Sequence, residues 1–185
     1  MIRPLEQQFD VKTVNSIRAL IDRIGRLNLP EGSSRYYAVE LVRCLEAGLL
    51  LGSLHLAASL LELVVRGTIA ERLAMMQTNP TDWEHRLEEM RRLGFSKLID
   101  HLVDAGLFEK TDGDSAKDFY NAVRIPIHHG LPHRYVTHHD ESKAFLKKLI
   151  GISMPTTSHD LEDVIEDFAV PQVDIVVGII ERNST

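Results

Sequence analysis

The feature that most constrains the fold is a long apolar run over residues 34–76, in which large apolar side chains recur every three or four positions. This spacing collects them on one side of an α-helix. Inside the run, Gly48 and Gly52 allow the close approach of another helix or mark a joint between two helices. Pro80 then interrupts the chain. The run therefore predicts helical structure that is buried on most sides.

The rest of the chain has the same period, and no stretch of useful length shows the alternating pattern of a strand. Helices are expected over residues 11–27, 34–76, 81–93, 98–106, 115–124, 141–150 and 158–181. Residues 1–10 are interpreted as an N-terminal arm and residues 11–182 as a single helical domain. The sequence therefore predicts an all-α bundle of about seven helices.

Serine, glycine and proline residues predict where several of these helices begin, end or break. A serine after Pro30, at Ser33 or Ser34, can cap the second helix. Residues 110–114 are polar and contain a glycine, which is typical of a turn. Pro171 marks a point where the last helix can break.

Length, charge and cysteine content narrow the class of protein. The 185 residues suffice for one domain with a real core, and the formal net charge of -6 argues against non-specific binding of nucleic acid over the whole surface. The single cysteine, Cys44, excludes an internal disulfide, and we expect it in the core of a cytoplasmic protein. Residues 47–65 approach the length of a membrane span but contain His55 and Glu62, so a buried helix is favoured and no membrane association is expected.

One short segment contains residues suited to a reaction. It reads Arg124-Ile125-Pro126-Ile127-His128-His129-Gly130. An arginine can hold a phosphate through two parallel hydrogen bonds, and a histidine can move a proton near neutral pH. Because Pro126 disfavours helical geometry at the residue before it, the preceding helix should end or kink at Arg124. The segment predicts phosphate-ester chemistry at the end of a helix.

This combination resembles the HEPN superfamily of all-helical domains, whose signature is an arginine, four to six residues and a histidine at the end of a late helix. Arg124, four intervening residues, His129 and the following Gly130 fit that count. The resemblance implies a metal-independent endoribonuclease without a cofactor, in which His129 handles the proton and Arg124 holds the phosphate. It also implies a homodimer in which two copies of the motif face one cleft, an RNA substrate cut to a 2′,3′-cyclic phosphate, and a toxin or defence role with an antitoxin partner.

The identity of the functional histidine stays open at this point. On an unbroken helix, Arg124 and His128 would share a face, whereas the family spacing favours His129. Farther along, Arg134 and Tyr135 could contact a nucleic-acid strand through phosphate and base stacking, together with His133. Glu62, inside the apolar run, needs a partner, and Arg66 lies four residues on; the pair can also support the Arg124 site.

Two other functions remain alternatives. Active members of the family usually have a polar residue after the arginine, and Ile125 in that place favours a non-catalytic helical module that binds RNA, a nucleotide or a protein partner. Five of the nine histidines lie in residues 128–139, which raises a weaker alternative, a His-metal enzyme. Because no HExxH motif is present and Pro132 interrupts helical spacing, a solvated loop without metal is favoured over a metal site.

Overall fold

The computed structural model describes residues 3–29, 32–77, 79, 82–124 and 158–183. Over these residues the predicted all-α bundle is confirmed, with seven continuous helices and no strand. The elements are η1 (Leu5–Gln7), α1 (Val11–Gly25), α2 (Ser33–Glu46), α3 (Leu50–Val64), η2 (Val65–Ile69), α4 (Ala70–Gln77), α5 (Trp83–Arg92), α6 (Phe95–Asp104), α7 (Lys110–Phe119), η3 (Tyr120–Arg124) and α11 (Ser158–Asn183). The segments η2 and η3 are π-helical and continue α3 and α7.

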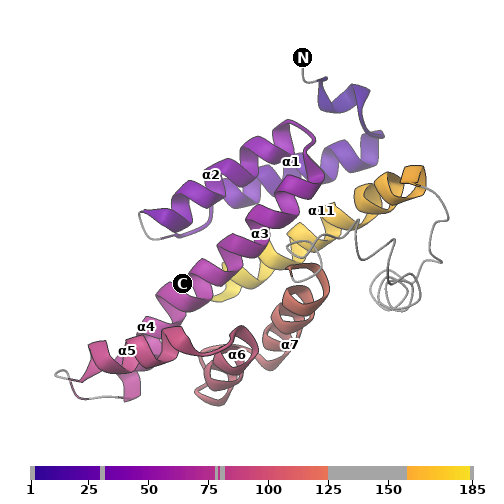
Figure 1. The fold of residues 1–185 in the computed structure, drawn as a ribbon. Helices are drawn as coiled ribbons and strands as arrows, with labels where there is room; N and C mark the ends of the chain where they lie inside the picture. Colours follow the sequence, from indigo (N-terminus) through magenta and orange to yellow (C-terminus); the bar gives the residue numbers. More distant parts are fainter. Residues whose placement is uncertain (1–2, 30–31, 78, 80–81, 125–157, 184–185) are drawn as a thin grey trace.

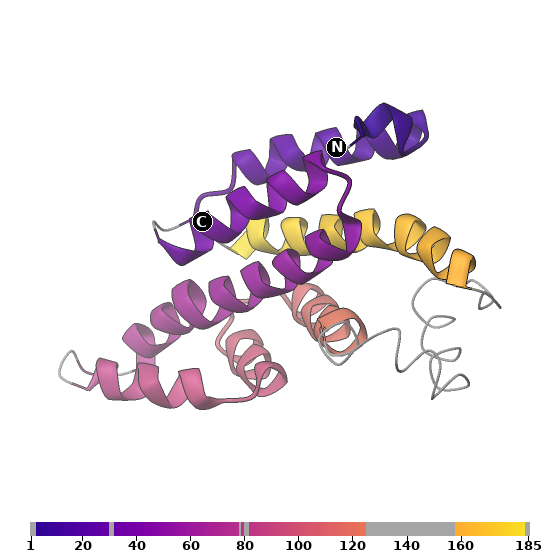
Figure 2. The same ribbon diagram turned by 45° about the horizontal axis from the view of Figure 1, so that its top comes forward.

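The helices are arranged around a central pair, α3 and α11, which lie side by side. The antiparallel α1–α2 hairpin covers one side of this pair, while α6 and α7 lie on the other (Figures 1 and 2). Buried apolar side chains from all of these helices form one contiguous cluster, and Leu5 and Phe9 pack against its edge. The segment expected as an N-terminal arm is thus attached to the core through these two side chains.

Helix α1 begins and folds as its sequence predicts. Asp10 precedes the first turn, and its carboxylate accepts a hydrogen bond of 2.7 Å from the backbone N–H of Thr13. This bond holds the pKa of Asp10 below its ordinary value. The apolar stripe that the period predicts is buried: Val14, Ile17, Leu20 and Ile24.

The long apolar run forms two helices with a joint at Gly48. Gly48 has a φ of 70°, a left-handed conformation that favours glycine, and it separates α2 from α3. Gly52 instead allows α3 to lie close to α2, because a Cβ at this position would lie 3.3 Å from Sγ of Cys44 on α2. Cys44, expected in the core, is half-buried, and that burial raises the pKa of its thiol. The predicted serine cap of α2 is wrong: Gly32, with a φ of 104°, precedes Ser33, and no side chain caps the helix.

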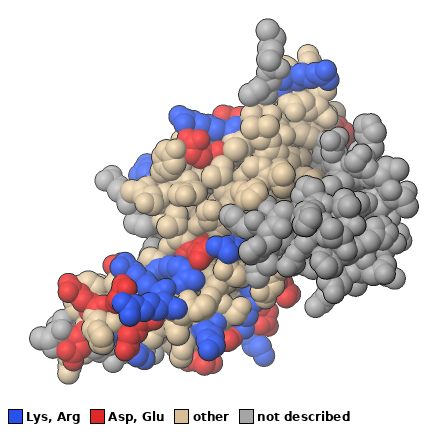
Figure 3. Space-filling model, viewed as in Figure 1, with Lys and Arg blue, Asp and Glu red and all other residues tan. Residues whose placement is uncertain are grey.

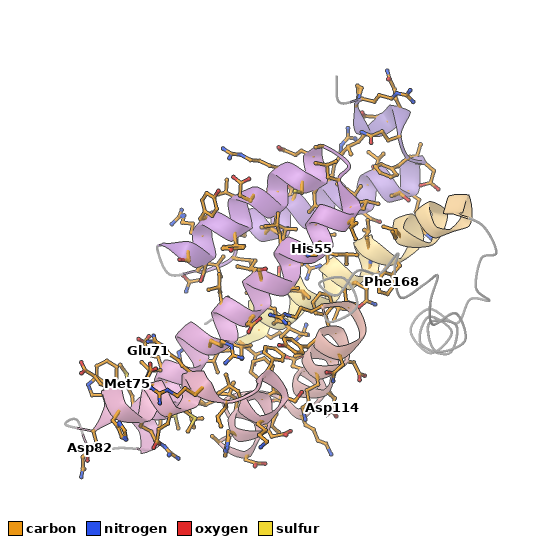
Figure 4. All side chains as sticks on the ribbon, in the orientation of Figure 1. His55, Glu71, Met75, Asp82, Asp114 and Phe168 are labelled. Carbon is orange, nitrogen blue, oxygen red and sulfur yellow. The ribbon has the colours of Figure 1, made fainter. Side chains whose placement is uncertain are left out.

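From Leu50 to Met76 the chain is one continuous helix of 27 residues. Its length and apolarity are those of a membrane span, a property that core helices of soluble proteins share, and half of its most apolar window is buried inside the described fold. Figure 4 places Glu71 and Met75 on its last part, α4, near Asp82 at the start of α5.

The predicted polar turn at residues 110–114 is wrong, because α7 begins at Lys110 and includes the whole segment. Asp112 is buried there, and Arg182 on α11 donates to both of its carboxylate oxygens at 2.6–3.1 Å. Asn183 adds a hydrogen bond of 2.9 Å. These partners hold the pKa of Asp112 below its ordinary value and compensate for its burial. A local sequence pattern cannot reveal a partner that lies on the last helix.

The last helix, α11, shows no break at Pro171 and runs from Ser158 to Asn183. Pro171 is exposed, while the residues on either side of it along the helix, including Phe168 and Val173, are buried against the core. This burial offsets the lost backbone hydrogen bond. The helix predicted over residues 141–150 lies outside the described residues.

Candidate functional site

Arg124 is the last residue of η3, at the end of the described part of the α7 helix. Its Nη2 lies 2.9 Å from Oε2 of Glu62 on α3, and the two side chains are 29% and 22% exposed. The half-buried position excludes part of the solvent and strengthens the ion pair relative to one on the open surface. The predicted catalytic arginine is therefore held by the acidic residue of the long apolar helix.

Glu62 also binds Arg66, one helical turn farther along. The Nε atom of Arg66 donates to Oε1 of Glu62 at 2.9 Å, in the four-residue spacing that the sequence predicts. The two carboxylate oxygens of Glu62 are thus divided between two arginines. The cluster of Glu62, Arg66 and Arg124 carries a formal net charge of +1, which leaves it attractive to an anion.

Arg66 links this cluster to the turn between α5 and α6. Its Nη1 donates to the backbone carbonyls of Arg91 and Leu93, at 2.9 and 3.0 Å. The carbonyl of Arg91 lies in the last turn of α5 and that of Leu93 directly after the helix, where helical partners are missing. A single guanidinium therefore holds both Glu62 and the end of α5 in place.

An aromatic pair supports Arg124 from the other side. Its guanidinium lies over the ring of Tyr120, 4.8 Å from the centroid. The ring of Tyr120 in turn stacks on Phe95, the first residue of α6, with centroids 4.3 Å apart and planes inclined by 10°. The sequence interpretation missed both aromatic residues; the only local signal was the four-residue spacing between Tyr120 and Arg124, which places them on one helical face.

Both arginines of the cluster lie in π-helical segments, Arg66 in η2 and Arg124 in η3. An extra residue in a helical turn redirects the side chains around it, and such turns are frequent at functional sites. On the face that Figure 3 shows, Lys, Arg, Asp and Glu side chains gather over the part of the molecule formed by α4–α6, whereas most of the surface over α1–α3 is uncharged. Glu62 near the end of α3 and Arg66 in η2 lie where α3 continues into α4.

The remaining candidate residues lie outside the described residues: His128, His129, His133, Arg134 and Tyr135. Of the predicted site, the structure therefore brings together Glu62, Arg66 and Arg124. No group of three or more potential ligands that could hold a metal occurs in the part of the chain that the structure describes. Because the histidine-rich segment is not in that part, the metal alternative stays a hypothesis.

Comparisons of the chain with protein-family models, with curated proteins and with solved structures found no significant match.

Proposed function

We propose that the protein is a HEPN-like endoribonuclease in which Arg124 holds a phosphate of RNA. The observation that carries the proposal is the fixed geometry of Arg124, which is ion-paired with Glu62 and stacked on Tyr120. A guanidinium already oriented by its neighbours loses little conformational entropy when it binds a phosphate. The net charge of +1 on the cluster favours the additional charge that develops on a phosphate during transfer.

The reaction follows from the chemistry of the two motif residues. His129 removes the proton from a ribose 2′-hydroxyl, and the oxygen attacks the adjacent phosphorus while the bond to the 5′-oxygen breaks. The departing 5′-oxygen takes up a proton from water, and His129 releases its own proton to solvent, so the step is balanced. Arg124 stabilises the charge on the non-bridging oxygens. The products are a 2′,3′-cyclic phosphate and a 5′-hydroxyl end, and no metal ion takes part. By the same resemblance, we propose a cytoplasmic dimer that acts as a toxin or defence component under control of an antitoxin.

A second candidate function is a non-catalytic module that binds RNA, a nucleotide or a protein partner. The observation that favours it is that Arg124 is already engaged by a carboxylate and an aromatic ring, so its role can be to hold η3 against α3. The apolar Ile125 after the arginine agrees with this alternative.

A cleavage assay with defined RNA ends separates the two candidates. The wild-type protein is incubated with a mixed RNA pool in excess EDTA, beside His129→Ala and His128→Ala. The proposal predicts cyclic-phosphate ends from the wild type, loss of cleavage in His129→Ala, and no cleavage of DNA of the same sequence. RNA binding without cleavage, at high protein concentration and over hours, would instead support the non-catalytic module.

A further inference from the structure

Arg66 lies between the Arg124 site and the end of α5. Its Nε donates to Oε1 of Glu62, and its Nη1 donates to the carbonyls of Arg91 and Leu93. A guanidinium has five N–H groups, so these bonds use three of them and leave the two on Nη2. Within the described part of the chain, no hydrogen bond occupies Nη2. Because the side chain is 25% exposed, this nitrogen can donate to an external anion beside Arg124.

Arg91 adds a further cation next to Arg66, in the last turn of α5. At 3.6 residues per turn, Arg91 lies about 40° around the helix from the buried Leu87, whereas Arg92 lies about 140° from it. Arg91 is therefore exposed on the flank of α5 that borders the core, and its own carbonyl is bonded to Arg66. Arg92 lies on the outer face of the helix and pairs with Glu88 at 3.3 Å.

The charge of Arg91 is not neutralised by a neighbouring carboxylate. All residues within four positions of it are described, and the two carboxylates among them, Glu88 and Glu89, pair with other arginines. The negative end of the α5 dipole stabilises a cation in this last turn, so Arg91 needs no carboxylate partner there. On the face that Figure 3 shows, the Lys and Arg side chains over α4–α6 belong to this part of the molecule.

We propose that the guanidiniums of Arg124, Arg66 and Arg91, the arginine row, bind consecutive phosphates of one RNA strand. The inference rests on the proposed function, because Arg124 marks the phosphate at which the strand is cut. Hydrogen bonds and an ion pair of 2.9 Å join each member of the row to the next, through Glu62 and the carbonyl of Arg91, so the row is continuous. A mononucleotide has too few phosphates to occupy it. The substrate is therefore a strand that continues beyond the cleaved bond.

The arginine row agrees with the proposed dimer, in which two copies of the motif face one cleft. Each row begins at its own Arg124, so two copies that meet at this cleft bring two rows to it. The strand then continues from the cleft along the end of α5 of either copy. Cations that follow the backbone bind a strand without reading its bases. The net charge of -6 on the whole chain confines such binding to a local surface of this kind.

A single strand with methylated 2′-hydroxyls tests binding apart from cleavage, because it keeps every phosphate and lacks the attacking group. Fluorescence anisotropy with a probe of about 12 nucleotides measures the Kd of the full chain in EDTA over a range of salt concentrations. Arg91→Ala should raise the Kd at least about fivefold and make the slope of log affinity against log salt shallower by about 0.7, the value for one phosphate contact on a single strand. Arg91→Lys keeps the charge and should keep the wild-type slope.

Lys97→Ala is the matched control for the loss of one positive charge. Lys97 is exposed on α6 and lies about 160° around that helix from Phe95, whose ring stacks on Tyr120 of the site. The control should leave the Kd within about twofold of the wild type and the salt slope unchanged, because it removes a cation outside the row.

Binding by Arg91→Ala that equals binding by Lys97→Ala would overturn the inference, as would a wild type that does not bind the probe. Thermal unfolding checks that each variant is folded; alanine suits a helix and leaves the carbonyl that Arg66 binds. Cleavage of unmodified RNA, measured in parallel, separates the inference from the proposed function. Wild-type cleavage with no effect of Arg91→Ala on binding overturns the row alone. A salt slope that depends on Arg91, without any cleavage, supports the row and contradicts the RNase.

Discussion

The carboxylate of Glu62 on α3 meets the guanidinium of Arg124 at the end of η3, with 2.9 Å between Oε2 and Nη2. The same carboxylate binds Arg66 through its other oxygen. Among the described residues at this site, Glu62 therefore joins two arginines, Arg66 of η2 and Arg124 of η3. The position of Arg124 relative to the core depends on this carboxylate, and the proposed function depends on that position.

The coupling between Glu62 and Arg124 can be measured with a double-mutant cycle of Glu62→Ala and Arg124→Ala. Because the pair is mostly shielded from solvent, we expect a coupling free energy of about 1–3 kcal/mol in urea unfolding. The exposed pair of Arg92 and Glu88 on α5 is the matched control and should give less than about 0.5 kcal/mol. A coupling no larger than that of the control would contradict the assigned role of Glu62.

The ion pair between Asp112 and Arg182 predicts a pH-dependent stability. Asp112→Asn removes a buried charge partner and should lower the free energy of unfolding by about 1–3 kcal/mol at pH 7. Since Arg182 lowers the pKa of Asp112 in the folded state, the contribution is fully present above the ordinary carboxyl pKa of about 3.9. It is lost as the pH falls through the lowered folded-state pKa.

Chemical unfolding of the wild type and Asp112→Asn from pH 7 to pH 3 checks this prediction. The difference between them should stay constant down to about pH 5 and shrink below about pH 4. Asp114→Asn, at an exposed position on the same helix, should change the unfolding free energy by less than about 0.5 kcal/mol. If the difference in unfolding free energy between the wild type and Asp112→Asn grew as the pH fell, the result would be inconsistent with the lowered pKa of Asp112.

Gly113 sets the distance between α6 and α7. A Cβ at this position would lie 2.7 Å from Cγ2 of Val103 and 3.2 Å from Cγ2 of Ile99. Gly113→Ala should therefore destabilise the protein by about 1–3 kcal/mol, although alanine is the better helix former.

Thermal unfolding of Gly113→Ala beside Gly25→Ala measures the effect, because a Cβ at Gly25 would meet nothing within 4 Å. Gly25→Ala should be neutral or slightly stabilising. Val103→Ala in the Gly113→Ala background should recover part of the loss, since it removes the clashing methyl group. A Gly113→Ala protein as stable as the wild type would show that α6 and α7 can separate without cost.

The helices were predictable from sequence because the features that indicate each helix lie within its own stretch of the chain. The apolar period predicts α1, and the run over residues 34–76 predicts the helices α2 through α4, with Gly48 and Gly52 as places for a joint or a close approach; the structure has the joint at Gly48. The prediction of a turn at residues 110–114 was wrong because the contacts that stabilise a helix there come from residues distant in sequence. A buried aspartate and a glycine are unfavourable inside an isolated helix, but Arg182 and the close packing of α6 make both suitable there.

In the candidate site too, the contact between residues close in sequence was predictable, whereas the contacts between distant helices were not. The spacing of Glu62 and Arg66 predicts their ion pair, and the structure contains it. The bond from Glu62 to Arg124 and the stack of Phe95 on Tyr120 join helices that are distant in sequence, and periodicity cannot specify such contacts. The roles proposed for His128, His129, His133, Arg134 and Tyr135 stay predictions, because these residues lie outside the described part of the chain.

The measurement that tests the central claim most directly is RNA cleavage in excess EDTA by the wild type and by Arg124→Ala, with Arg92→Ala as an exposed-arginine control. Circular dichroism first establishes that each variant is folded. The account predicts cyclic-phosphate products from the wild type and from Arg92→Ala, and at least about a hundredfold slower cleavage by Arg124→Ala. Equal cleavage by Arg124→Ala, or none by the folded wild type, would contradict the assignment of Arg124 as the phosphate-holding residue of an RNase.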